Sequence, residues 1–148
     1  MKKRILIVED EEVFVGTIQL FIRKAIRKRE ETIEIEYEVC SNYQQAVDTL
    51  KMNCSSDIPC YDLVIVDFKI PMTLRSLYRF PGLDICKLIR EKFPRIPYLP
   101  ISRLLKEVKS SSGFEDYKDD IEKAVAKENK EELASRIIAM LTQQSITT

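Results

Sequence analysis

Uninterrupted apolar runs mark two predicted strands inside a sheet. Residues 5–8 are Ile-Leu-Ile-Val and residues 63–66 are Leu-Val-Ile-Val. Runs without polar alternation are typical of strands that are buried on both faces, as in a parallel sheet. Residues 33–39 differ, because isoleucine, tyrosine and valine alternate with three glutamates, which predicts a half-exposed edge strand. Residues 96–101 predict a fourth strand and residues 123–126 a short fifth.

Apolar residues at helical spacing separate these strands. The repeating positions are Val13, Phe14, Ile18, Phe21, Ile22, Ala25 and Ile26, then Tyr43, Ala46, Val47 and Leu50, then Ile85, Cys86, Ile89 and Phe93, and finally Leu133, Ala134, Ile137, Ile138 and Leu141. Ser41 and Gln44 have capping-box spacing. A further helix is expected within 104–122, although residues 110–113 interrupt it. Alternating strands and helices predict an α/β fold with a doubly wound, five-stranded parallel sheet, in which Pro100 is awkward because it cannot donate to a ladder.

Composition excludes several chemistries. The 148 residues are expected to form one domain over 1–148, and the 24 basic and 24 acidic residues predict no nucleic-acid or membrane partner. Apolar runs of at most five residues are too short for a membrane span or a signal peptide, so a cytoplasmic location is expected. The chain has no histidine, so it holds no imidazole base, and any phosphohistidine must belong to a partner.

The four cysteines are expected to be ordinary reduced thiols. Cys54 and Cys60 bracket a short loop, which suggests a redox pair or half of a metal site as alternatives. Their spacing matches no common zinc pattern, and no histidine is available to complete one. Reduced thiols therefore remain the expectation, as is usual inside cells.

Three acids follow two of the predicted strands. Glu9 and Asp10 come directly after residues 5–8, and Asp67 comes directly after residues 63–66. Sites in open α/β folds form at the carboxyl ends of strands, so these acids are expected to converge. Like charges that lie close together repel unless a cation sits among them, and a few oxygen ligands suit Mg²⁺. The alternatives are that Glu9 and Asp10 only favour the dipole of the first helix, and that Asp67 is a cap or turn residue.

The chain resembles the receiver domain of two-component response regulators over essentially its whole length. The motifs that carry the resemblance are residues 5–11 (Ile-Leu-Ile-Val-Glu-Asp-Glu), residues 63–67 followed by Phe68-Lys69-Ile70-Pro71, residues 82–84 (Gly-Leu-Asp), Ser102 and Lys127. The resemblance implies a flavodoxin-like fold with strand order 2-1-3-4-5 and helices on both faces of the sheet.

The resemblance also implies a phosphoacceptor site. Asp67 would be the nucleophile that takes a phosphoryl group. Glu9, Asp10, Asp67 and the backbone carbonyl of Lys69 would hold Mg²⁺. Lys127 would pair with a phosphoryl oxygen, as a compact point charge.

Ser102 would donate a hydrogen bond to another phosphoryl oxygen. The alternative for Ser102 is a plain helix N-cap. The alternative for Lys127 is a solvated surface lysine, with Lys123 as its substitute.

Four features depart from the family pattern. Glu128 follows Lys127 in place of the usual proline, and Ala124 replaces the aromatic residue that couples to Ser102, with Phe114 or Tyr117 as candidate substitutes. Arg103 follows Ser102 where small residues are common, and could narrow the access to Asp67 or reach an anion. Residues 72–81 form an insertion, which is either a surface loop or a lid or docking element.

The sequence predicts a stand-alone signalling domain rather than an enzyme, with residues 143–148 as a short tail. It would accept phosphate from a histidine kinase or a histidine phosphotransfer protein, signal to a downstream effector protein, and catalyse only its own phosphoryl transfer and dephosphorylation. Whether it forms a homodimer is left open. The alternatives are a degenerate receiver that acts as a phosphorylation-independent interaction module and, less favoured, a Mg²⁺-dependent phosphatase, for which Lys69 replaces the second acid.

Overall fold

The computed structural model describes residues 1–29, 32–71, 80–110 and 115–146, with side chains of the last helix as far as Thr142. The strands are β1 (Lys2–Val8), β2 (Glu34–Cys40), β3 (Leu63–Asp67), β4 (Tyr98–Ser102) and β5 (Val125–Ala126). The helices are α1 (Glu12–Arg27), α2 (Tyr43–Asn53), α3 (Pro81–Lys92), α4 (Leu105–Ser110), α5 (Lys118–Lys123) and α6 (Lys130–Ile146), with a 3₁₀ turn η1 (Glu115–Tyr117). Among the residues that the structure describes, no helix is both long and apolar enough to cross a membrane.

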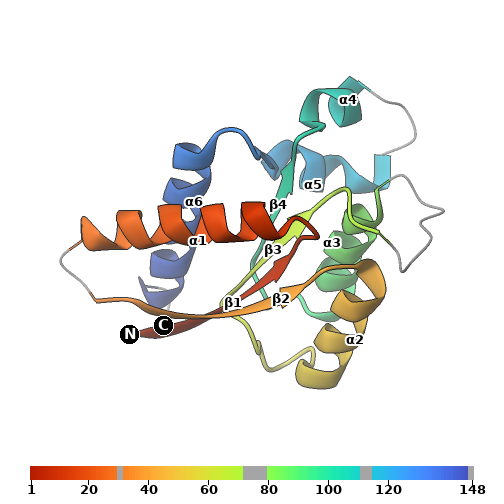
Figure 1. Ribbon diagram of the computed structural model, residues 1–148. Helices are drawn as coiled ribbons and strands as arrows, with labels where there is room; N and C mark the ends of the chain where they lie inside the picture. Colours follow the sequence, from red (N-terminus) through yellow and green to blue (C-terminus); the bar gives the residue numbers. More distant parts are fainter. Residues whose placement is uncertain (30–31, 72–79, 111–114, 147–148) are drawn as a thin grey trace.

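The five strands form one parallel sheet in the order β2-β1-β3-β4-β5 (Figure 1). This order confirms the predicted doubly wound, flavodoxin-like α/β fold. The three central strands β1, β3 and β4 have neighbours on both sides, and β2 and β5 are the edges. The predicted edge strand is therefore at the edge, and lysine and arginine of β1 pair there with its glutamates at 3.4 Å (Lys2–Glu36) and 3.7 Å (Arg4–Glu38).

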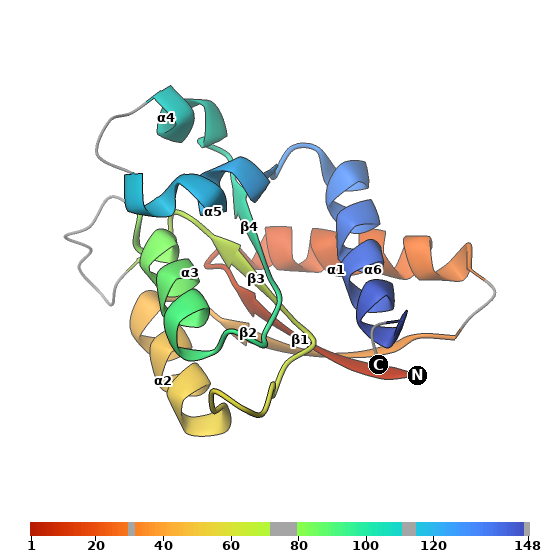
Figure 2. The same ribbon diagram turned by 180° about the vertical axis from the view of Figure 1, so that it is seen from behind.

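Helices cover both faces of the sheet (Figures 1 and 2), which explains the uninterrupted apolar runs. Ile5 and Ile7 pack into a core with residues of α1 and α6, whereas Leu6 and Val8 pack into a core with residues of α2 and α3. Successive side chains of a strand point to opposite faces, so a strand covered on both sides must be apolar at every position.

Pro100 lies inside β4 without disturbing the sheet. β5 pairs with β4 only at Ile101 and Ser102, so Pro100 precedes the paired part of that edge. On the other side, Pro100 pairs in register with Val66 of β3. A short neighbouring strand thus removes the difficulty that proline normally causes in a central strand.

Two predicted element ends were wrong by a few residues. Asn42, not Ser41, is the N-cap of α2, because the Asn42 side chain accepts a hydrogen bond from the Gln45 backbone N–H at 2.8 Å. The Gln45 side chain accepts from the Ser41 backbone N–H at 2.9 Å, one residue before the N-cap, so the reciprocal hydrogen bond of a capping box does not form. The expected tail at 143–148 is helical as far as Ile146, since α6 continues without a break.

The expectation of four reduced cysteines is wrong for two of them. Cys54 and Cys60 form a disulfide, with their Cα atoms 5.3 Å apart. The loop after α2 turns back within seven residues and brings the two Cα atoms into the range that a disulfide needs. Cys40 and Cys86 are free thiols buried in the core.

A buried carboxylate ties α5 to the body of the fold. Asp120 on α5 is fully buried, and Arg90 on α3 donates to both of its carboxylate oxygens at 3.0–3.2 Å. The hydroxyl of Tyr98 on β4 donates to the same carboxylate. Arg90 also donates to the Asp116 backbone carbonyl at 3.2 Å. These contacts link two helices and a strand through one acid.

We expect Arg90→Ala to lower the free energy of unfolding by about 3 kcal/mol, because it leaves the buried Asp120 carboxylate without its cation. Urea denaturation measures this change. Lys92→Ala, an exposed position on the same helix, serves as the control and should change the stability by less than about 0.5 kcal/mol. Equal stability of the two variants would show that the pair does not hold α5.

Candidate functional site

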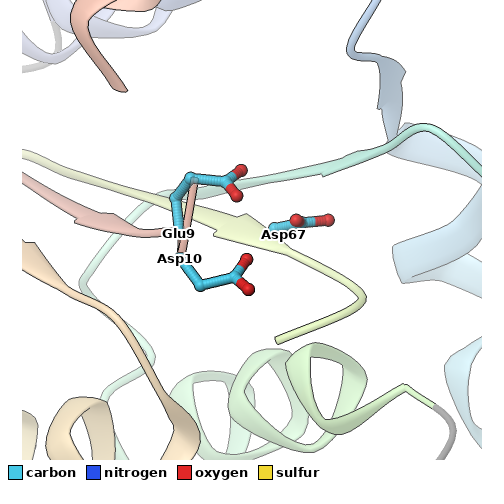
Figure 3. Close-up of side chains that lie close together, drawn as sticks. All are labelled: Glu9, Asp10 and Asp67. Atoms are coloured by element: carbon cyan, nitrogen blue, oxygen red, sulfur yellow. The ribbon is translucent and has the colours of Figure 1, made fainter. Parts of the chain in front are cut away.

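Three acids converge at the carboxyl edge of the sheet, as expected (Figure 3). One carboxylate oxygen each from Glu9, Asp10 and Asp67 lies within 4.8 Å of the others. Glu9 and Asp67 are buried, whereas Asp10 is exposed. Val8 and Val66 pair in register, so the residues that follow β1 and end β3 emerge side by side.

Gly82 at the start of α3 allows the helix to approach this edge closely. A Cβ atom there would overlap the Asp67 backbone carbonyl and would lie 2.8 Å from the Cα atom of Phe68. The Gly82 N–H donates to the Phe68 carbonyl at 2.9 Å. The glycine therefore fixes the backbone that follows Asp67, because any side chain would push α3 away from β3.

Lys127 is buried between the acids and is not a surface lysine. Its side chain is 1% exposed, and its Nζ lies 2.8 Å from Glu9 Oε2, 3.2 Å from Asp67 Oδ2 and 3.6 Å from Glu11 Oε1. The contact with Glu9 is the shortest of the three. The alternative lysine, Lys123, lies elsewhere, with its ammonium over the ring of Tyr98.

Burial and neighbouring charges shift the pKa values of Glu9, Asp67 and Lys127. Burial, followed by the charge of Asp67, raises the pKa of Glu9 to about 8. Burial also raises the pKa of Asp67, and Lys127 opposes that shift. Burial alone would lower the pKa of Lys127, but the hydrogen-bonding and charge of Glu9 and Asp67 outweigh it and raise the pKa. The ammonium of Lys127 therefore stays protonated.

Backbone contacts fix Lys127 without the proline that usually follows it. The Lys127 N–H donates to the Ser102 carbonyl at 3.1 Å, and the Asn129 N–H donates to the Ala126 carbonyl at 3.1 Å. Glu128 is exposed. These hydrogen bonds hold Lys127 at the end of β5 although Glu128 stands in place of the proline.

Ser102 ends β4 and is 1% exposed. Its Oγ accepts a hydrogen bond from the Leu104 N–H at 2.9 Å. Because α4 begins only at Leu105, Ser102 lies too early to be its N-cap, and that alternative is wrong. A serine hydroxyl that accepts one hydrogen bond still has its own hydrogen to donate.

A cavity of about 450 Å³ opens at these side chains. It is lined by residues from the ends of four strands and the turns that follow them, namely Asp10, Glu11, Asp67, Lys69, Ile70, Pro71, Ser102, Arg103, Leu104 and Lys127. The Lys69 N–H donates to Asp67 Oδ1 at 3.3 Å. The cavity therefore gives a small anion a route to the Asp67 carboxylate.

The structure adds two residues that the sequence did not single out for the site. Glu11 contacts Lys127 and accepts a hydrogen bond from Arg103. Phe14 lies beneath both cations, with its ring centre 4.2 Å from Lys127 Nζ and 5.7 Å from the Arg103 guanidinium carbon. Glu11 belongs to the acidic run after the first strand, but neither its partners nor those of Phe14 are close in sequence.

Tyr117, one of the two candidate substitutes for the missing aromatic, does not line the cavity. Ala124 is buried in a cluster with Phe68 and Val108. The Tyr117 hydroxyl donates to a carboxylate oxygen of Asp84. Phe114 lies outside the described residues, as do residues 72–79 of the predicted insertion. Of that insertion, the structure describes only Phe80 and Pro81.

Comparison with known proteins identifies the fold. No protein-family model and no curated protein sequence matches the chain. Among solved structures, the bacteriophytochrome response regulator AtBRR is 18% identical, with 96% of this chain and 94% of that chain covered and a TM-score of 0.62. The non-phosphorylated receiver domain of the stress response regulator RcsB from Escherichia coli is 14% identical, with 97% and 95% covered and a TM-score of 0.62.

A third similar structure is the Mn²⁺-bound form of response regulator Rcp1, which is 19% identical, with 84% of this chain and 78% of that chain covered and a TM-score of 0.53. The chain therefore has the fold of response regulator receiver domains. At these identities the likeness establishes the fold and not the chemistry, which must be argued from the site.

We expect Lys127→Met to lower the free energy of unfolding by about 3 kcal/mol, because it leaves buried carboxylates without their cation. Guanidinium denaturation in the absence of divalent ions measures the loss. Lys130→Met, at an exposed position, is the control. Adding Asp67→Asn to Lys127→Met should restore part of the stability; no restoration would mean that charge is not the cause.

Proposed function

We propose that the chain is a response regulator receiver domain, spanning residues 1–148, that accepts a phosphoryl group on Asp67. The observation that supports this proposal most strongly is the arrangement around Asp67. A buried ammonium lies 3.2 Å from its carboxylate, and two further acids lie within 4.8 Å at the edge of the sheet. A hydrolase that used Asp67 would need an acid–base partner, and the nearby position 69 is a lysine.

The phosphoryl group would come from a phosphohistidine of a partner protein, because this chain has no histidine. An oxygen of the Asp67 carboxylate attacks the phosphorus atom and the P–N bond breaks. The electron pair of that bond goes to the imidazole nitrogen, which takes up a proton. The product is an aspartyl phosphate, and attack by water on its phosphorus breaks the P–O bond and returns the carboxylate and inorganic phosphate.

Lys127 and Ser102 would hold the transferred group. The ammonium of Lys127 moves from the Asp67 carboxylate to a phosphoryl oxygen and keeps its contact with Glu9. The Ser102 hydroxyl donates to a second phosphoryl oxygen. Phosphoryl transfer needs little from the protein beyond positioning and charge neutralisation, and these two groups supply both.

The acids fit a divalent cation. Glu9, Asp10 and Asp67 offer three hard oxygen ligands, with the Lys69 carbonyl as a fourth, which suits Mg²⁺. Burial is the largest cause of the raised pKa of Glu9 and the charge of Asp67 is the second, so a cation among these acids would stabilise the Glu9 carboxylate. When bound, Mg²⁺ supplies charge neutralisation at the phosphoryl oxygens. The Mn²⁺ in the similar structure of Rcp1 supports this assignment.

The partners follow from this chemistry. A histidine kinase or histidine phosphotransfer protein would supply the phosphoryl group, and phosphorylation would shift the chain between two conformations that an effector protein distinguishes. We place the protein in the cytoplasm, where such kinases present their phosphohistidine.

A second candidate function is a phosphorylation-independent interaction module. Ala124 favours it, because that position holds no aromatic side chain to report the state of Ser102. The presence of the buried Glu9, Asp67 and Lys127 favours the first function, because unused buried charges cost stability.

Incubation with phosphoramidate and Mg²⁺ should add one phosphoryl group to the chain, seen by intact-mass spectrometry as a labile gain. Asp67→Asn should abolish the gain because it removes the attacking carboxylate, and omission of Mg²⁺ should reduce it. Asp119→Asn, at an exposed position, is the matched control and should behave as the unsubstituted chain. A folded chain that gains nothing in any condition would favour the interaction module.

Mg²⁺ binding should strengthen with pH. The carboxylate of Glu9 must lose its proton to bind the cation, and its pKa is raised to about 8, so affinity should rise between about pH 6 and about pH 8, by up to about tenfold per unit. Isothermal titration calorimetry measures this rise and the proton released. In Glu9→Gln the pH dependence should flatten, and in Asp10→Asn binding should weaken. An affinity independent of pH in the unsubstituted chain would contradict the assignment of Glu9.

A further inference from the structure

One carboxylate bridges two cations at the mouth of the cavity. The Arg103 guanidinium donates to Glu11 Oε2 at 2.8 Å, and the Lys127 ammonium lies 3.6 Å from the other oxygen, Glu11 Oε1. Arg103 follows directly on Ser102 and lines the same cavity as Asp67. A continuous chain of alternating charge therefore runs from Asp67 through Lys127 and Glu11 to Arg103.

This arrangement holds Arg103 near the site through weak contacts. The Arg103 and Glu11 side chains are 55% and 45% exposed, and exposed ion pairs contribute little to stability. The guanidinium of Arg103 and the ammonium of Lys127 both lie over the ring of Phe14, so the arginine is held beside the lysine. A group with more negative charge than one carboxylate can therefore replace Glu11 as the ion-pair partner of Arg103 at a small cost in free energy.

A phosphoryl group on Asp67 is such a partner. It carries about two negative charges where the carboxylate carried one, and it presents three oxygens to the cavity. A guanidinium matches phosphate oxygens with two parallel hydrogen bonds, which a single ammonium cannot do. Lys127 meets Glu11 at the longest of its three carboxylate contacts, so it too would leave Glu11 for the new charge.

We propose that Arg103 is a phosphoryl-binding residue of this site, which Glu11 holds in the unphosphorylated chain and which moves to the phosphoryl oxygens when Asp67 is phosphorylated. This inference rests on the proposed function. It assigns to the Glu11–Arg103 pair an exchange of partners that reports the phosphorylated state, at a site where Ala124 offers no aromatic side chain to do so.

Substitutions of Arg103 and of Glu11 should change the affinity for a phosphoryl mimic in opposite directions. Beryllium fluoride is a phosphoryl mimic, and its binding to Asp67 at saturating Mg²⁺ can be followed by ¹⁹F NMR. Arg103→Ala should weaken binding about tenfold, because one charge-assisted contact is lost. Arg103→Lys should lie between Arg103→Ala and the unsubstituted chain. Glu11→Gln should tighten binding about threefold, because the competing carboxylate is gone.

Matched controls separate this effect from general charge. Lys106→Ala removes one positive charge, and Glu12→Gln one negative charge, at exposed neighbouring positions. Both should leave beryllium fluoride binding within about twofold of the unsubstituted chain, because exposed charges are screened. Urea denaturation checks that every variant is folded.

Two results would overturn the proposal. If Arg103→Ala and Glu11→Gln weaken binding equally, or if neither changes it, the ion pair is only structural. If the unsubstituted chain binds no beryllium fluoride and gains no phosphoryl group, the proposed function fails and the inference fails with it. The two failures are distinguishable because the second is seen without any substitution.

Discussion

A lysine that is 1% exposed forms ion pairs with two buried acids at the carboxyl edge of the sheet, and the architecture of the site depends on that ion pairing. Glu9 follows β1 and Asp67 ends the neighbouring strand β3, so the fold forces their charges together inside the protein. Burial of such charges is tolerable only with a cation among them. Lys127 reaches them from β5, a strand of two residues whose position is fixed by the pairing of the Lys127 N–H with the Ser102 carbonyl.

The parts of the fold that depend on local pattern could be predicted. Apolar runs at residues 5–8 and 63–66 became central strands, because a strand covered on both faces leaves no polar position. The convergence of Glu9, Asp10 and Asp67 followed, since residues after parallel strands meet at one edge. The strand order was implied by the family resemblance. Lys127 was identified through the family resemblance alone; its burial could not be foreseen from a stretch rich in lysine and glutamate.

The parts that depend on contacts between distant segments were missed. The Cys54–Cys60 disulfide depends on how sharply the loop after α2 turns, which spacing does not specify. The pairing of Arg103 with Glu11 joins residues that are 92 positions apart, and only the packed sheet brings them together. The same holds for Arg90 and Asp120, which are 30 positions apart.

The central claim is that Asp67, and no other acid of the cluster, forms the covalent bond to phosphorus. Borohydride reduces an aspartyl phosphate to homoserine, which tandem mass spectrometry locates within a peptide. After treatment with phosphoramidate and Mg²⁺, this account predicts homoserine at position 67 alone. Homoserine at position 10 or at another acid, or none in a chain that has gained a phosphoryl group, would contradict it.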